Sequence, residues 1–254
     1  MATKSATAVR LAVESALAGR VIAPFQYRDW RVLKTAPTGV TSVDTLTGGL
    51  PRGGLTEISG PAGAGKTSLL TAALAARTRA AEVCALVDAR DAFDPETAEA
   101  AGVQLERLLW VRCREIAQAM RVTDLLLQGG GFGMVAVELS DVSPRLVRRV
   151  PLNVWFRWRR AVENTQTILV VLGQESNAKT CASLVLRMES ESAQWLSTAG
   201  GPRQTEALLL EGFISGVERV STRRQEEVLM KQLDAKEERT RLVARVANKY
   251  GRKR

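Results

Sequence analysis

Short apolar runs alternate with amphipathic stretches through the middle of the chain. The runs hold few polar residues, as strands buried on both faces do, and the stretches between them carry the apolar spacing of helices that cover a sheet. The runs are residues 55–59, 83–88, 107–111, 134–138 and 167–173, and the helical stretches are 68–79, 95–102, 117–128 and 152–163. This alternation predicts an α/β fold with a mainly parallel central sheet flanked by helices.

The pattern changes after residue 173. Apolar stretches at 183–188, 208–213 and 216–220 follow one another without helical spacing between them. Neighbouring strands without crossover helices pair antiparallel, so we expect the sheet to finish with antiparallel strands. Residues 38–54, ahead of the first strand, are rich in glycine and proline, which predicts tight turns.

One stretch carries a specific chemical motif between a predicted strand and a predicted helix. The sequence Gly60-Pro61-Ala62-Gly63-Ala64-Gly65-Lys66-Thr67 fits the phosphate-loop pattern Gly-x-x-x-x-Gly-Lys-Ser/Thr at every fixed position. Glycines let backbone N–H groups curl toward an anion, and the following helix adds the positive end of its dipole. Lys66 is expected to reach the β- and γ-phosphates and Thr67 to place its hydroxyl on Mg²⁺.

The charge balance narrows the class of partner. The 254 residues carry a formal net charge of +9 and no histidine. An excess of basic residues indicates an anionic partner, with nucleic acid first and an acidic protein second, and a general bias toward arginine is the alternative. The lack of histidine excludes histidine acid–base catalysis and histidine metal ligation.

The cysteines and the hydropathy indicate the cellular compartment that we expect for the protein. Cys84, Cys113 and Cys181 lie far apart without Cys-x-x-Cys spacing, so we interpret them as buried, reduced thiols of a cytoplasmic protein. No apolar run approaches the roughly 18 residues of a membrane span, and the first residues lack the apolar core of a signal peptide. We therefore expect no membrane association.

The two ends of the chain differ from its middle. Residues 7–18 have helical spacing and form either a packing helix or an arm that docks on a neighbour, and residues 23–37 are expected to be irregular. Residues 226–238 have mixed charges and predict a solvated helix. Residues 239–254 are basic without an acid, which suits either a tail for nucleic acid or a partner, or an edge strand followed by a basic end.

The phosphate loop and its surroundings resemble the core of the RecA/RadA recombinases. The resemblance rests on residues 38–53, on Thr56 to Ser59 before the loop, on Leu86 to Pro95, on the strand ending at Glu138, and on Gly173-Gln174. It covers roughly Thr38 to Val220 and implies a RecA-like phosphate-loop NTPase fold that uses ATP and Mg²⁺. The chain is accordingly divided into an N-terminal helix and linker at 1–37, a RecA-like ATP-binding core at 38–220 and a basic C-terminal extension at 221–254.

A narrower branch resembles the chain at further segments. They are residues 122–134, 155–164 and 178–187, and the branch is ImuA, the RecA-like accessory proteins of bacterial inducible-mutagenesis cassettes. That resemblance implies a role in the SOS response to DNA damage and in translesion synthesis. It also implies a recombinase or a translesion polymerase subunit as the partner.

The recombinase resemblance assigns candidate site residues and shows where this chain departs from the pattern. The glutamate that polarises the attacking water in recombinases is replaced here by Arg90, a cation that cannot take a proton from water. Asp91 follows it and is expected to point elsewhere. The magnesium-side acid is Glu138, and Gln174 matches the glutamine that senses the γ-phosphate. The expected cofactor-binding residues are Gly60, Pro61, Ala62, Gly63, Ala64, Gly65, Lys66, Thr67, Ser68 and Asp94, of which Asp94 matches a contact to the nucleotide base.

The segments that replace the recombinase DNA-binding loops are short. They are residues 141–150 and 175–182, and both look too small to thread a DNA strand through a filament. Basic residues nonetheless gather there around aromatic ones, where they could bind phosphates and stack bases. The alternative is that Leu152, Trp155, Phe156 and Val162 pack on the sheet. The candidate residues for nucleic acid or a partner are Arg145, Arg148, Arg149, Arg157, Arg160, Lys249, Arg252, Lys253 and Arg254, of which Lys249 matches a recombinase subunit-interface lysine.

Three functions are compatible with these features. The first is an ATP-binding accessory protein that docks on a recombinase filament or a translesion polymerase subunit and hydrolyses ATP weakly or not at all. The second is an active DNA-dependent ATPase or recombinase, against which Arg90 argues. The third is an interaction module with a vestigial nucleotide site, against which the intact phosphate-loop motif argues. Oligomerisation is compatible with each.

Overall fold

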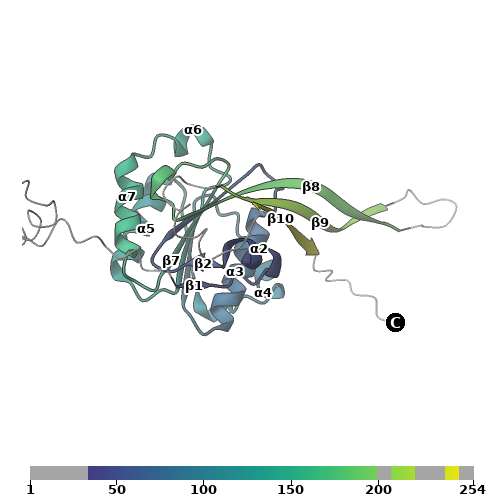
Figure 1. Cartoon of the computed structure of the whole chain (residues 1–254), viewed down its shortest axis with the longest axis horizontal. Helices are drawn as coiled ribbons and strands as arrows, with labels where there is room; N and C mark the ends of the chain where they lie inside the picture. The colour runs from purple at the N-terminus through teal and green to yellow at the C-terminus, as the bar shows by residue number, and fades with distance from the viewer. Residues whose placement is uncertain (1–33, 199–206, 221–237, 246–254) are drawn as a thin grey trace, which may run out of the picture. The chain divides into compact units, whose positions relative to one another are not determined.

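A central sheet organises the chain. The computed structural model describes residues 34–198, 207–220 and 238–245, all within one compact unit, Leu33–Arg254. The sheet has eight strands in the order β10-β9-β8-β3-β7-β6-β4-β5 (Figure 1). They are β3 (Leu55–Ser59), β4 (Cys84–Asp88), β5 (Leu108–Arg112), β6 (Met134–Glu138), β7 (Ile168–Gly173), β8 (Leu184–Thr198), β9 (Ala207–Arg219) and β10 (Arg239–Arg245). A separate two-stranded sheet joins β1 (Thr35–Ala36) to β2 (Leu50–Pro51).

The direction of the strands confirms the expected fold class. Strands β5, β4, β6, β7, β3 and β8 pair in parallel, while β9 pairs antiparallel with both β8 and β10. Side chains along the parallel strands alternate between two apolar cores, one on each face of the sheet. Both faces are covered, which is why these strands are almost continuously apolar.

Helices cover each face. Residues from α2 (Thr41–Thr47), α3 (Lys66–Arg79) and α4 (Pro95–Ala100) contribute to one core, and residues from α5 (Ile116–Gly129), α6 (Pro144–Val147) and α7 (Leu152–Val162) to the other. Two short 3₁₀ helices, η1 (Leu105–Arg107) and η2 (Lys179–Cys181), lie in the connections. In the described part of the chain no helix is long and apolar enough to span a bilayer.

Three local expectations were wrong. Residues 208–213 and 216–220 form one continuous strand, β9, because Ser215 lies buried within it instead of in a turn. Residues 41–47, expected as turns, form α2, which ends at Gly48 in a left-handed conformation. Pro144–Val147 forms the short helix α6 within a segment expected to be a loop.

The aromatic helix α7 also packs differently from the expectation. Trp155, Trp158 and Val162 are buried against the sheet, and the two indole rings meet edge to face with centroids 5.3 Å apart. Leu152 and Phe156, expected on the same face, are instead 45% and 48% exposed. The buried residues Trp155, Trp158 and Val162 are spaced by three and four positions and so share one helix face, and Phe156 lies outside it.

The cysteines and part of the C-terminal extension are as expected. Cys84, Cys113 and Cys181 are buried and free, and burial raises the pKa of Cys84 to about 12, so this thiol is neutral. Of the alternatives for the basic C-terminal segment, residues 239–245 form the edge strand β10. The predicted helix at 7–18 lies outside the described residues, as does almost all of that at 226–238.

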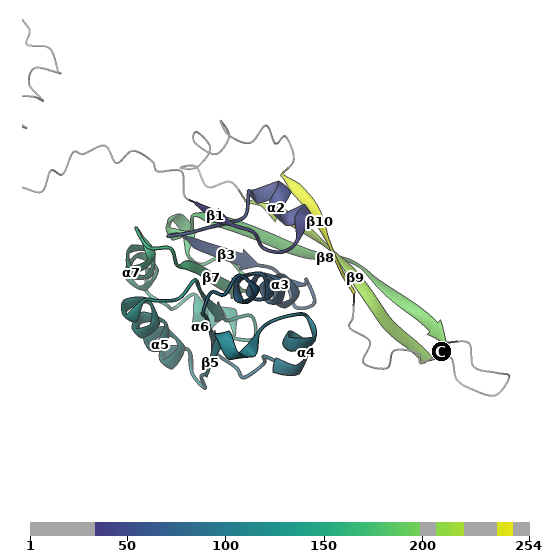
Figure 2. The same ribbon diagram turned by 90° about the horizontal axis from the view of Figure 1, so that it is seen from below.

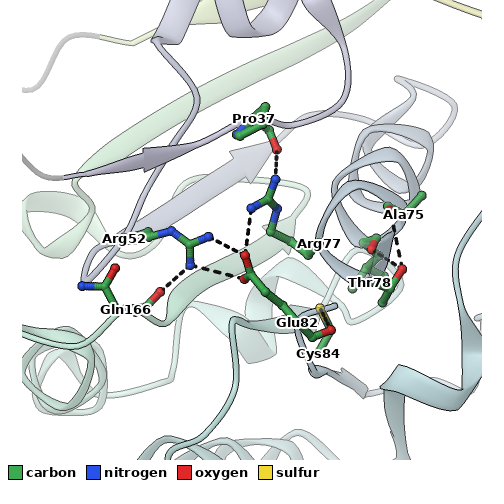
Figure 3. A network of polar contacts seen from close by, with 9 residues as sticks. Pro37, Arg52, Ala75, Arg77, Thr78, Glu82, Cys84 and Gln166 are labelled. Carbon is green, nitrogen blue, oxygen red and sulfur yellow. Dashed lines mark hydrogen bonds and ion pairs between the residues drawn. The ribbon is translucent and has the colours of Figure 1, made fainter. Parts of the chain in front are cut away.

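A partly buried ionic network joins the segments that precede β3, β4 and β7 (Figure 3). The Glu82 carboxylate accepts hydrogen bonds from Arg52 at 2.6 Å and from Arg77 at 3.0 Å. Arg52 also donates to the Gln166 carbonyl, and Arg77 to the Pro37 carbonyl. The three charged side chains are at most 22% exposed. The network therefore connects the segment before β3, the end of α3 and the turn before β7.

Removing the carboxylate should destabilise the fold. Glu82→Gln leaves two guanidinium groups in this setting without their counter-charge, which typically costs about 3 kcal/mol for a buried pair. We expect a loss of that size in the free energy of unfolding, measured by urea denaturation. Glu106→Gln, at an exposed position in η1, is the matched control and should change the value by less than about 0.5 kcal/mol. Equal midpoints for the two variants would contradict the assignment.

Candidate nucleotide-binding site

The phosphate loop lies at the edge of the sheet where β3, β4, β6 and β7 all end. It connects the last residue of β3 to the first of α3. Gly63 and Gly65 adopt left-handed backbone conformations with φ of 76° and 81°, and Pro61, Ala62 and Gly63 are exposed. The loop therefore has the expected bend, with its outer turn open to solvent at the start of α3.

Two glycines of the loop are required by close packing. A Cβ atom on Gly60 would lie 2.2 Å from the Met188 carbonyl oxygen of β8. A Cβ atom on Gly65 would lie 2.7 Å from the ring of Phe213 and 2.9 Å from the hydroxyl of Ser215, both in β9. Strands β8 and β9 thus press on opposite ends of the loop, and only glycine fits at either end.

Lys66 lies inside the bend. Its Nζ donates hydrogen bonds of 2.7 Å to the carbonyl oxygens of Gly60 and Pro61, and its side chain is buried. Burial lowers the pKa of Lys66, while the charges of Glu138 and Asp141 act in the opposite direction. An ammonium has three donors, so one remains for a phosphate. Thr67 is exposed and Ser68 half-buried in the first turn of α3.

Glu138, at the end of β6, fits a magnesium-side acid. Its Oε1 accepts the Ser140 N–H at 2.8 Å, and its Oε2 is buried without a hydrogen-bond partner among the described residues. A buried carboxylate oxygen is seldom left unpaired, and a metal-bound water would satisfy it. Thr67 and Glu138 are therefore the residues that would hold Mg²⁺, which would neutralise phosphate charge when bound.

The end of β4 holds no carboxylate aimed at the phosphate loop. The Asp88 side chain is buried and accepts the N–H groups of Arg90 and Phe93 and the indole N–H of Trp110. Arg90 is exposed, and Asp91 pairs with Arg112 at 3.8 Å. The Asp88 carboxylate therefore stabilises the turn after β4. Asp91 pairs with a residue of the edge strand β5, in agreement with the expectation that it points elsewhere.

Asp94 has a role in the local fold. Its carboxylate accepts the Glu96 N–H at 3.1 Å and caps α4, and it also accepts a hydrogen bond from the Thr97 hydroxyl. The residue is exposed near the phosphate-loop edge of the sheet. Its predicted contact with a nucleotide base remains a prediction.

The two short connections at 141–150 and 175–182, which were predicted to replace DNA-binding loops, are hydrogen-bonded to each other. Gln174 donates from Nε2 to the carbonyl oxygen of Ser140 at 2.8 Å, and the N–H of the same Ser140 binds Glu138. Arg148 forms two hydrogen bonds with Glu175, at 2.7 and 2.5 Å. Gln174 is exposed, and its link to Ser140 connects the end of β7 with the acid of β6.

The sequence reading missed Glu57. This carboxylate is 2% exposed in β3 and accepts the Ser176 hydroxyl and the N–H groups of Asn177 and Ala178. It therefore fixes the turn that follows Gln174. A charged residue in the middle of a buried strand was the available signal, because a buried carboxylate must find hydrogen-bond donors.

The basic cluster divides into paired and unpaired arginines. Arg148 is bound to Glu175, and Arg157 is bound to Asp124, which also accepts the indole N–H of Trp158. The exposed residues Arg145, Arg149 and Arg160 have no ion pair among the described residues. The candidates Lys249, Arg252, Lys253 and Arg254 lie outside the described residues.

Comparison with known protein families shows to which family the chain belongs. Residues 12–148, which are 137 of the 254, match the family model described as the RecA N-terminal domain. The chain belongs to the RecA family. The RecA proteins of Brucella anthropi and Clavibacter michiganensis subsp. michiganensis are each 38% identical, over 116 and 154 residues, which is 44% and 54% of this chain. RecA of Mesorhizobium japonicum is 30% identical over 158 residues, or 56% of the chain.

These matches cover only part of the relatives. The aligned region amounts to 32% of the Brucella protein, 42% of the Clavibacter protein and 43% of the Mesorhizobium protein. The RecA relationship thus supports the phosphate-loop core, and the matched family region includes Glu138 and Arg90.

The state of Glu138 should make Mg·ATP binding depend on pH. Burial raises the pKa of Glu138, and its bond to the Ser140 N–H and the charge of Lys66 only partly oppose this. Glu138 therefore becomes protonated at a higher pH than an ordinary glutamate. The affinity for Mg·ATP should fall as the pH is lowered from about 8 toward 5, a range in which an unperturbed glutamate is still ionised. Isothermal titration calorimetry at a series of pH values measures this.

A glutamine at position 138 tests whether Glu138 causes the pH dependence. Glu138→Gln should weaken Mg·ATP binding by about tenfold at pH 8, as loss of a group that holds metal-bound water does. It should also flatten the pH profile. Glu99→Gln, at an exposed position in α4, is the control and should keep the slope. The same slope in all three proteins would assign the pH dependence to another group.

Proposed function

We propose that the chain is a RecA-like, ATP-binding accessory protein of the DNA-damage response, of the ImuA type. It acts in the cytoplasm in SOS-linked translesion mutagenesis, by docking on a recombinase filament or on a translesion polymerase subunit. ATP and Mg²⁺ act mainly as a binding signal, and hydrolysis is weak or absent. The combination that carries the proposal is a fully formed phosphate loop beside a β4 end that presents Arg90.

The phosphate loop supports nucleotide binding. The amides of Gly63 to Lys66 lie at the start of α3, where the helix dipole favours an anion. Lys66 is buried in the bend, where burial lowers its pKa and the charges of Glu138 and Asp141 oppose this shift. A vestigial site would not need glycine at both ends of the loop, where any side chain would collide with β8 or β9.

The end of β4 supports weak hydrolysis. Activation of water in phosphoryl transfer needs a carboxylate or amide that orients the nucleophile opposite the leaving group. Arg90 cannot accept that proton, and Asp91 is held by Arg112. Arg90 could instead contact the phosphates of a bound nucleotide, which would strengthen binding without supplying a base.

The fastened connections support a docking role over strand exchange. Gln174 and Arg148 join the two segments that would otherwise be free to surround DNA. Glu57 of β3 accepts hydrogen bonds from backbone N–H groups of the second segment, residues 175–182, and so holds it against the sheet. Segments held at both places present a fixed surface, which suits recognition of another protein better than threading a strand.

Nucleotide binding is tested at the lysine. Mg·ATP at about 100 times its Kd should stabilise the chain by about 2.7 kcal/mol, seen as a rise in Tm. Lys66→Ala should abolish most of that rise. Lys179→Ala removes a lysine at an exposed position in η2 and should behave like the parent chain. Equal Tm values with and without Mg·ATP in the parent chain would favour an interaction module with a vestigial site.

Hydrolysis is tested against RecA itself. We expect ATP turnover by this chain, with and without single-stranded DNA, to be lower than that of RecA by about 100-fold, the smaller end of the effect of a general base. Phosphate release under identical conditions measures it. Rapid hydrolysis that single-stranded DNA stimulates and that Glu138→Ala removes would establish the alternative, an active DNA-dependent ATPase.

A further inference from the structure

The hairpin of β8 and β9 continues past the rest of the sheet. Strand β8 pairs with β3 only from Leu184 to Arg187, and β10 covers β9 only from Gly212 to Glu218. Beyond these, Trp195 to Thr198 of β8 pairs with Ala207 to Leu210 of β9 and with no third strand among the described residues. Figure 2 shows this part projecting past α3 and α4. We call it the free end of the hairpin.

The free end presents apolar side chains to solvent. Trp195 is 56% exposed, and Leu210, its cross-strand partner, is 39% exposed. Two register shifts, between Ser190 and Ser192 and between Gln194 and Trp195, interrupt the ladder just before this pair. Such bulges re-aim side chains. An isolated two-stranded hairpin is at best marginally stable in water, so an exposed tryptophan here indicates a surface that a partner covers.

The charges on the hairpin define the kind of partner. From residues 192 to 198 and 207 to 213, Glu211 is the only charged residue, in a chain whose net charge is +9. The lack of cations on these two strand segments disfavours a phosphate backbone and favours a protein as the occupant. The complementary surface is an apolar groove with a neutral or basic rim, and tryptophan is the residue most enriched at the centre of such contacts.

The part of the same hairpin that lies within the main sheet contacts the phosphate loop, and we call it the hairpin root. The Met188 carbonyl of β8 faces Gly60, and Phe213 and Ser215 of β9 face Gly65. The Ser215 hydroxyl is fully buried and has no hydrogen-bond partner among the described residues. An unpaired buried hydroxyl costs free energy that a small shift of the neighbouring loop could recover. A change in the phosphate loop therefore acts directly on both strands of the hairpin.

We infer that the free end of the hairpin, through Trp195 and Leu210, docks in an apolar groove of a protein partner, and that nucleotide in the phosphate loop controls this docking through the hairpin root. The inference rests on the proposed function for the presence of a nucleotide and for the partner, a recombinase or a translesion polymerase subunit. It adds the surface that the partner contacts and the route by which the nucleotide reaches it.

The docking surface is tested by binding of the full chain to each purified candidate partner, with and without Mg·ATP. Trp195→Ser combined with Leu210→Ser should weaken binding to one partner by about tenfold or more, the effect of losing a central tryptophan. Mg·ATP should stabilise this double variant as much as the parent chain. Leu125→Ser, at a leucine 68% exposed on α5, is the control and should bind normally.

The outcomes separate the two levels of the proposal. If the parent chain binds neither partner, the docking role fails together with this inference. If it binds one and the double variant binds equally well, the hairpin assignment alone is wrong. The assignment is also wrong if light scattering shows a dimer of the chain that the double variant loses, because the occupant would then be a second copy. Loss of binding to single-stranded oligo(dT) in the double variant would point to nucleic acid instead.

The coupling between the nucleotide and the hairpin root is measured separately, by hydrogen exchange. Mg·ATP should change hydrogen exchange in peptides that cover residues 188–195 and 210–215, and Lys66→Ala should remove the change. Phe213→Leu, which reduces the contact with Gly65, should reduce it while nucleotide still raises the Tm. Unchanged exchange in a chain that Mg·ATP stabilises would show that the hairpin root does not respond to the nucleotide.

Discussion

The close contact between the phosphate loop and the antiparallel end of the sheet is the constraint on which the site depends. Gly60 and Gly65 have no room for a Cβ atom, because the Met188 carbonyl and the Phe213 ring occupy that space. Strand β8 lies beside β3 and β9 lies beside β8, so both strands pack against the loop and require glycine at these two positions. The anion-binding amides and the antiparallel strands are therefore one packing unit, although more than a hundred residues separate them in the chain.

The parallel strands place the chemistry on a single edge. Glu138 ends β6, Asp88 ends β4 and Gln174 follows β7, so all three lie beside the loop that follows β3. Among the described residues at this edge, Glu138 keeps a buried carboxylate oxygen without a hydrogen-bond partner, whereas the Asp88 carboxylate accepts hydrogen bonds from its own turn. The edge is equipped to hold a charged ligand and a metal ion, and it offers no base at the β4 position.

The two connections above this edge, residues 141–150 and 175–182, are short. Hydrogen bonds from Gln174, Arg148 and Glu57 link them to each other and to β3. Two of the arginines expected to meet an anion are paired with carboxylates, and two of the aromatic rings lie in the core. Arg145 and Arg149, which follow β6, are exposed and have no ion pair among the described residues. This arrangement supports the proposal of a nucleotide site combined with surfaces for protein contacts.

The sequence by itself determined the parallel core and the site motif. Continuous apolar strands, helical spacing between them and the fixed positions of the phosphate loop are local signals, and each of the five core strands appears within a residue or two of its expected bounds. The resemblance that places Arg90 where recombinases have an acid also rests on the sequence alone. These features need no knowledge of which strands are neighbours.

Tertiary structure decided the rest, because it depends on residues far apart in the chain. Local periodicity cannot show that Trp158, and not Phe156, faces the core, since either choice gives an amphipathic helix. Glu57 and Arg148 acquire their roles from donors and acceptors that the fold brings to them. The same holds for Phe213 and Ser215, whose contact with Gly65 follows from the order of strands in the sheet. Strand order is set by the balance of packing over the whole domain, which no short stretch of sequence contains.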